Sequence, residues 1–211
     1  FRHHVHAMNR RVDRATLFAT RSDYDLFAEL LGWAQREERM EITAWCLMPS
    51  HWHLMLRPDD RAHLSRFMHR LETTHAVGFR RATDTRGNGS LYGGRFKSFP
   101  VPMERLLRTA VYIERNPVKA ALVDRATAWL HGSASTAHLP PTWPHVTRLP
   151  HQVERLRRGL LKRPLPEELE REIERWAVPR AHARADLDHG AERAVRRALD
   201  AIGRARDMVR G

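Results

Sequence analysis

The sequence predicts an α+β sandwich around a central antiparallel sheet, with flanking helices and a helical C-terminal extension. Two observations carry this prediction. Between residues 2 and 115, strand-like and helix-like hydrophobic patterns follow one another in the order strand, helix, strand, strand, helix, strand, helix. Beyond residue 150 the patterns are amphipathic and helical, with Arg gathered on one side.

The first strand is predicted over residues 2–9, where apolar and polar residues alternate loosely, and a charged turn follows at 10–14. Ser22 is typical of a helix N-cap, with acidic residues in the turn behind it. The helix that follows carries apolar side chains at helical spacing: Tyr24, Phe27, Leu30, Leu31 and Ala34.

A hairpin is predicted next, because Pro49 and Ser50 separate two strand-like segments, 40–47 and 51–56. Alternation along the first segment would place Ile42, Ala44 and Cys46 on one face.

A second helix is predicted over residues 62–82, an extended segment over 91–101, and a third helix over 104–115 that ends before Pro117. The apolar stripe of the second helix consists of Leu64, Phe67, Met68, Leu71, His75 and Phe79.

The C-terminal part is predicted to be organised separately. Residues 1–136 would form the main domain, a Pro-rich linker would cover 137–151, and a basic helical extension would cover 152–211. Within the extension, helices are expected near 153–162, 167–176 and 191–209. They would contact a DNA duplex, mediate association such as a homodimer, or pack on the main domain.

Charge indicates the kind of partner. The 211 residues include 37 Lys and Arg against 25 Asp and Glu, a net charge of +12, and all but three of the basic residues are Arg. Arg grips phosphate oxygens in pairs, which favours nucleic acid as the partner. The chain shows no export signal, no apolar run that would span a membrane and a single cysteine, Cys46, so we expect a cytoplasmic protein without membrane association.

Two histidines on the second hairpin strand are the first candidate for chemistry. In a strand, His51 and His53 point to the same face and Trp52 points to the other. Two imidazoles on a rigid strand make half of a metal site, although two exposed surface histidines would show the same spacing. His4 and His6 repeat that spacing, and we expect them to be structural or DNA-facing.

Tyr112 is the second candidate. At about 100° per residue it falls opposite the apolar face of its helix, beside Arg105, Arg108 and Thr109, with Asn116 one turn further on. Such a tyrosine is either a reactive phenol or the cap of a second small cluster.

Residues 92–98 combine glycines, Arg95, Phe96 and Lys97 on an extended segment, a pattern suited to single-stranded nucleic acid, although Phe96 fits a core position equally well. Taken together, the candidates suggest one reaction. A cation on two histidines would polarise a phosphodiester, and a tyrosine hydroxyl would attack its phosphorus.

Five stretches in order resemble the single-tyrosine HUH transposases, and most closely the REP-associated tyrosine transposases. They are MPSHWHL at 48–54, His4 to Phe18, RFKS at 95–98, YIERNPVKA at 112–120, and Trp129 with Ser133 and Ser135. They span residues 2–136.

The resemblance implies a ferredoxin-like core in which Tyr112 is the nucleophile and His51, His53 and Asn116 hold Mg²⁺ or Mn²⁺. The implied substrate is single-stranded DNA beside a REP-like hairpin, cut and rejoined through a 5′-phosphotyrosine. The basic residues expected to contact this DNA are Arg10, Arg11, Arg95, Lys97, Arg105 and Arg108.

Two other functions stay open at this point. A repeat-hairpin-binding protein without catalysis would bind the same DNA and form no covalent adduct. A metal-dependent phosphodiesterase would use water as the nucleophile, and its cleavage would survive the Tyr112→Phe substitution.

Overall fold

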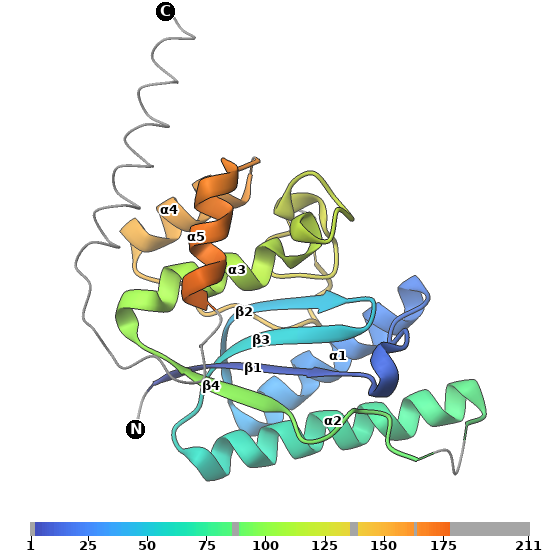
Figure 1. Cartoon of the computed structure of the whole chain (residues 1–211). Coiled ribbons are helices and arrows are strands. Elements are labelled where there is room, and N and C mark those ends of the chain that lie inside the picture. Colours follow the sequence, from blue (N-terminus) through green and yellow to red (C-terminus); the bar gives the residue numbers. More distant parts are fainter. Residues whose placement is uncertain (1–2, 86–88, 136–138, 163, 178–211) are drawn as a thin grey trace, which may run out of the picture. The chain divides into compact units, whose positions relative to one another are not determined.

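The computed structural model describes residues 3–85, 89–135, 139–162 and 164–177, and the chain divides into two compact units, Phe1–Pro164 and Leu165–Gly211. The first unit contains a four-stranded antiparallel sheet in the order β2-β3-β1-β4 (Figure 1). Its strands are β1 (His4–Arg10), β2 (Glu41–Met48), β3 (His51–Arg57) and β4 (Lys97–Val101). This order confirms the predicted ferredoxin-like α+β class.

Helices α1 (Arg21–Glu38) and α2 (Arg61–Thr83) cover one face of the sheet (Figure 1). The apolar stripes predicted for both helices lie in this core, against Trp45, Trp52 and Leu54 of the strands. The predicted N-cap of α1 is wrong by two residues. Thr20 is the cap, because its hydroxyl accepts from the Asp23 N–H while the Asp23 carboxylate accepts from the Thr20 N–H.

The β2–β3 hairpin forms as predicted, but the face assigned to Ile42 is wrong. The pairing register shifts between Ile42 and Ala44, so a β-bulge interrupts the alternation. Ile42 therefore packs with the α1–α2 core, whereas Ala44 and Cys46 point to the opposite face.

Helix α3 (Leu106–Lys119) covers that opposite face and packs through Leu106, Ala110 and Ile113. It follows a short 3₁₀ turn, η2 (Met103–Arg105). The prediction that Pro117 ends the helix is wrong. Pro117 lies inside its last turn, where a proline removes a single backbone hydrogen bond.

The boundaries predicted for the linker and the extension differ from the structure, because residues 139–162 belong to the first unit. The Gln35 side chain bonds the backbone of His145, and the Thr147 N–H donates to the Ile42 carbonyl. At Gly32 of α1, an added Cβ would lie 2.1 Å from the Thr142 carbonyl oxygen, so only glycine allows this close approach. The segment is thus built into the fold.

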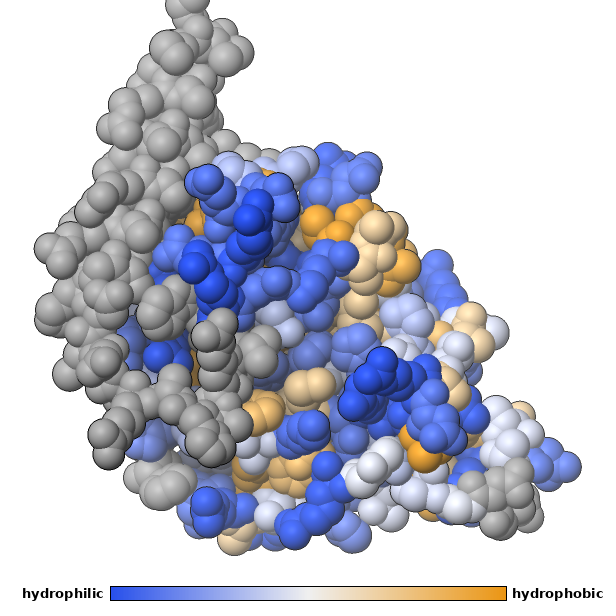
Figure 2. Space-filling view, in the orientation of Figure 1, coloured by the Kyte–Doolittle hydropathy of each residue, from blue (hydrophilic) through white to orange (hydrophobic). Residues whose placement is uncertain are grey.

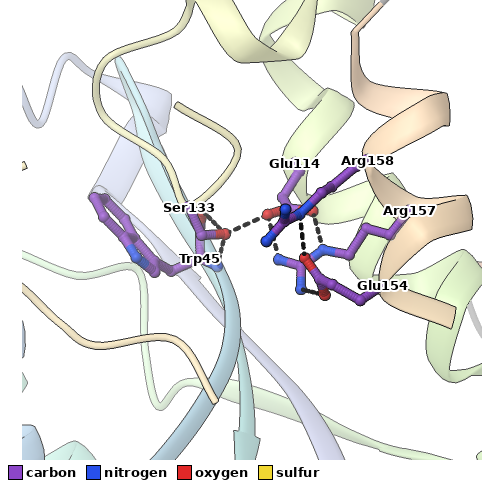
Figure 3. A network of polar contacts seen from close by, with 6 residues as sticks. All are labelled: Trp45, Glu114, Ser133, Glu154, Arg157 and Arg158. Carbon is purple, nitrogen blue, oxygen red and sulfur yellow. Dashed lines mark hydrogen bonds and ion pairs between the residues drawn. The ribbon is translucent and has the colours of Figure 1, made fainter. Parts of the chain in front are cut away.

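Helix α4 (His151–Leu161) joins α3 through buried charge (Figure 3). Arg157 makes a paired contact with the Glu114 carboxylate, with Nε to Oε2 at 2.8 Å and Nη2 to Oε1 at 2.5 Å. Glu154 of α4 also binds Arg157, and Ser133 donates to Glu114 from the other side. Arg115 of α3 also donates to the Leu160 carbonyl of α4. Arg108, Thr109 and Asn116 are buried as well, so the polar face predicted for α3 is largely covered.

Ser133 belongs to a segment that lies along the outer edge of β2. The Leu47 N–H donates to the His131 carbonyl, and the Ser133 N–H donates to the Trp45 carbonyl. The Trp129 indole donates to the Leu47 carbonyl, just after the short 3₁₀ helix η3 (Ala126–Ala128). These bonds place the tryptophan–serine segment recognised in the sequence directly on the sheet.

In the second unit the structure describes one helix, α5 (Glu167–Ala177). Its first turn carries acidic residues, whose negative charge interacts favourably with the positive end of the helix dipole. The helix predicted near 191–209 lies outside the described residues. None of the described helices is long and apolar enough to cross a membrane. On the face in view in Figure 2, hydrophilic residues predominate over the described surface, with smaller hydrophobic areas between them.

Candidate active site

The two histidines of β3 face α3, as the strand period predicts. Trp52 between them is buried in the core on the α1–α2 side. The ring centroids of His51 and His53 are 4.9 Å apart, at a steep interplanar angle of 86°. The hairpin therefore presents two imidazoles on one rigid surface beside the helix that carries Tyr112.

Each of these imidazoles has a partner on Nδ1. The Ser50 hydroxyl lies 3.2 Å from His51 Nδ1, and His6 Nε2 lies 2.9 Å from His53 Nδ1. In both rings Nε2 is thus the nitrogen available to a ligand. Burial lowers the pKa of His51, and it lowers that of His53 well below the ordinary value, so both rings are neutral at pH 7 and can bind a cation.

His6 was not among the predicted site residues, yet it contacts two of them. It lies on β1, is 3% exposed, and contacts both His53 and Tyr112, with its ring centroid 6.1 Å from that of Tyr112. Burial lowers the pKa of His6 to about 4. Of the two expected roles, structural or DNA-facing, the burial of His6 favours the structural one. No local sequence pattern indicated this contact, which arises because β1 pairs with β3.

Tyr112 projects from α3 toward these histidines and is half-buried. Its ring centroid lies 6.1 Å from that of His53, nearly perpendicular to it. One turn further on, Asn116 donates through Nδ2 to the carbonyl oxygens of Tyr112 and Ile113. Since a carbonyl only accepts, this arrangement leaves Oδ1 as the free ligand atom of Asn116.

A cavity of about 330 Å³ connects these groups. It is lined by Met8, Arg10, Arg14, Ser50, His51, His53, Tyr112 and Asn116. The predicted nucleophile and all three predicted metal ligands therefore meet in one place. Arg14 was not among the predicted DNA contacts. It ends the short helix η1 (Val12–Arg14), and its φ of 55° turns the chain back beside the site.

The donor set fits a divalent cation that accepts both nitrogen and oxygen. Two imidazole nitrogens and one amide oxygen suit Mn²⁺ better than Mg²⁺, which prefers oxygen alone. Among the described residues, no group of three or more His, Cys, Asp and Glu could hold a metal ion, so the expected ligand set depends on the amide oxygen of Asn116. Three protein ligands would leave coordination positions for phosphate oxygens and water.

The other predicted DNA contacts divide by exposure. Arg95 and Lys97 are exposed at the start of the edge strand β4. Arg11 is occupied, since its guanidinium bonds the Thr16 carbonyl and lies 5.0 Å over the Phe79 ring.

The two arginines predicted on the Tyr112 helix are less accessible. Arg105 is half-buried in η2. Arg108 is only 8% exposed, so its burial speaks against the predicted phosphate contact.

Comparison with known proteins gives the family. The family model described as "Transposase IS200 like" matches residues 1–116, which include His51, His53, Tyr112 and Asn116. A comparison with curated proteins finds no match.

Two solved structures are similar to the chain. One is a REP-associated tyrosine transposase bound to a REP hairpin, at 19% identity, covering 63% of this chain and 76% of that chain with a TM-score of 0.48. The other is described as a transposase from Deinococcus radiodurans R1, at 18% identity, covering 55% and 91% with a TM-score of 0.42. Since the family model spans more than half of the chain, the resemblance seen in the motifs is confirmed at the level of the family: the protein belongs to the IS200-like transposases.

Proposed function

We propose that this transposase cuts and rejoins single-stranded DNA beside REP-like hairpins through a 5′-phosphotyrosine on Tyr112. The observation that carries the proposal is the position of the Tyr112 ring, 6.1 Å from that of His53 in a cavity shared with two arginines. A phenol, two imidazoles and two guanidinium groups at one cavity are the parts that phosphodiester transfer needs.

His51, His53 and Asn116 would hold a divalent cation, Mn²⁺ or Mg²⁺, which would polarise a phosphate oxygen and stabilise the charge of the transition state. Arg10 and Arg14, which line the same cavity, would bind the phosphate through paired N–H donors.

In the cleavage step the Tyr112 oxygen attacks phosphorus and the bond from phosphorus to the 3′ oxygen breaks. The phenol proton is lost to water in the cavity, and the departing oxygen takes up a proton to become a 3′-hydroxyl. Rejoining is the reverse step on another strand, so the phosphoester bond energy is kept and no nucleotide cofactor is consumed.

The test uses end-labelled single-stranded hairpin oligonucleotides, taken from repeats flanking the gene, with Mn²⁺ or Mg²⁺ and a denaturing gel. We expect a slowly migrating protein–DNA adduct that is lost in Tyr112→Phe and His51→Ala. Tyr24→Phe is the matched control, because Tyr24 is buried against Phe18 and His131, away from the cavity lining.

Two results would overturn the proposal. Cleavage without an adduct that persists in Tyr112→Phe would identify a phosphodiesterase that uses water. Hairpin binding without cleavage under either metal would identify a repeat-binding protein.

A further inference from the structure

His6 and His53 share a buried hydrogen bond between two ring nitrogens. His6 Nε2 and His53 Nδ1 are 2.9 Å apart, and both side chains are 3% exposed. A bond between two imidazole nitrogens needs one N–H and one lone pair. The proton therefore resides on one ring, and its position decides what the other nitrogen of His53 can do.

The strand pairing sets this contact. On the antiparallel β1–β3 pair, Met8 lies opposite His53 and His6 lies opposite Met55, so His6 is the diagonal neighbour of His53 on the α3 side. Phe99 of β4 and Tyr112 of α3 flank the His6 ring at centroid distances of 6.3 and 6.1 Å. The backbone and two aromatic rings thus hold the His6 ring against His53.

A cation on His53 fixes the direction of the hydrogen bond. Nε2 of His53 can bind a cation only through its lone pair, so the ring proton must lie on Nδ1. His53 Nδ1–H then donates and His6 Nε2 accepts. With the roles reversed, His53 would carry its proton on Nε2 and could bind no cation there.

We propose that His6 is a positioning residue of the metal centre, which accepts the Nδ1–H of His53 and so presents Nε2 of His53 as a ligand. The inference rests on the proposed function, because it assumes a cation at His51 and His53. Partners of this kind orient metal-ligating histidines, and their loss weakens metal binding by about 10- to 100-fold.

The test compares His6→Phe, His6→Gln and His4→Phe in the full chain. Phe fills the space of the ring without an acceptor, and Gln offers an amide oxygen where Nε2 stood. His4 is the matched control, because it lies two residues from His6 on the same strand face, whereas the hydrogen bond to His53 is made by His6. Circular dichroism and thermal unfolding first establish that each variant is folded.

The first measurement is Mn²⁺ affinity, determined from the electron paramagnetic resonance signal of free Mn²⁺. We expect His6→Phe to weaken binding by about 10- to 100-fold, His6→Gln to recover most of the loss, and His4→Phe to bind like the wild type. Equal affinity of wild type and His6→Phe would overturn the proposal.

The second measurement is nuclear magnetic resonance of the Mg²⁺-saturated protein with ¹⁵N-labelled histidine. We expect a proton on His53 Nδ1 with scalar coupling across the hydrogen bond to His6 Nε2, and loss of that coupling in His6→Phe. A proton on His6 Nε2 in the loaded protein would overturn the proposal.

Metal binding by the wild type and by His51→Ala separates the metal centre from the role of His6. If the wild type binds Mn²⁺ and His51→Ala does not, the metal centre stands and the His6 result decides its own proposal. If the wild type binds neither cation, the metal centre and the role of His6 fail together.

Discussion

The side-chain amide of Asn116 donates to the carbonyl oxygen of Ile113 at 3.2 Å. In a regular helix the backbone N–H of residue 117 would donate to this carbonyl, but Pro117 has no N–H. The same nitrogen donates to the Tyr112 carbonyl at 2.9 Å. Asn116 thus completes the helix around the proline, and this anchoring directs its oxygen away from the backbone. One side chain serves both the helix that carries Tyr112 and the metal site proposed beside it.

We expect Asn116→Ala to lower the free energy of unfolding by about 1 kcal/mol, because the Ile113 carbonyl loses its donor. Adding Pro117→Ala restores a backbone N–H and should return most of that stability. Mn²⁺ affinity should stay low in both variants, because the amide oxygen is absent from both. Urea unfolding and metal titration separate the two roles. Recovery of metal affinity in the double variant would show that Asn116 acts through the helix alone.

The Glu114–Arg157 pair predicts a large stability effect. Arg157→Met leaves a buried carboxylate without its cation, which costs about 3–5 kcal/mol. The double variant Glu114→Gln with Arg157→Met should recover part of the loss, because the glutamine oxygen still accepts from Ser133 and carries no charge. Urea unfolding measures both. If Arg157→Met has the same free energy of unfolding as the wild type, the ion pair between α3 and α4 does not stabilise the fold.

Salt dependence tests the two arginines at the cavity. Each phosphate contact to a single strand contributes about 0.7 to the slope of log K against log salt concentration. Arg10→Ala and Arg14→Ala should each weaken binding of the hairpin flank and lower the slope by about that amount. Arg81→Ala is the control, because Arg81 is exposed on α2 and does not line the cavity. A slope unchanged in both cavity variants would place the phosphate elsewhere.

Glu72 predicts a pH dependence of stability. Burial raises the pKa of Glu72 to about 7 from an ordinary 4.5, and the hydrogen bond from Asn9 offsets only part of this. The folded state therefore holds the proton more tightly than the unfolded state. The resulting stabilisation is present below pH 4.5 and is lost as the pH rises through 7.

Between pH 5 and 7.5 the wild type should therefore lose stability relative to Glu72→Gln, measured by urea unfolding at each pH. His6 and His75, whose pKa values burial lowers to about 4, act in the opposite direction but equally in both proteins. Parallel pH profiles for the two proteins would contradict the shift.

Local patterns predicted the parts of the site that depend on one element. The strand period placed His51 and His53 on one face and Trp52 on the other, and the helical period placed Asn116 beside Tyr112. These relations need no knowledge of neighbouring elements, and the cavity brings them together as expected.

Relations between elements were beyond the sequence. His6 joins the site through the pairing of β1 with β3, and its spacing with His4 gave no hint of that contact. Arg108 falls on the polar side of α3 on a helical projection, but the folded chain buries it. The bulge after Ile42 adds one residue to the strand, so Ile42 points to the face opposite that of Ala44, and the sequence of the bulge carries no turn signal.

The hydrogen bonds along β2 have a consequence for how copies of this chain meet. An open strand edge invites pairing with another molecule, and through it aggregation. On β2, however, the carbonyls of Ile42, Trp45 and Leu47 and the N–H groups of Trp45 and Leu47 already bond to later parts of the same chain. At the other edge, β4 is five residues long and contains Pro100, which donates no backbone bond. Strand addition is thus hindered at β2 by bonds within the chain and discouraged at β4 by its short length and its proline, which limits aggregation through the edges of this sheet.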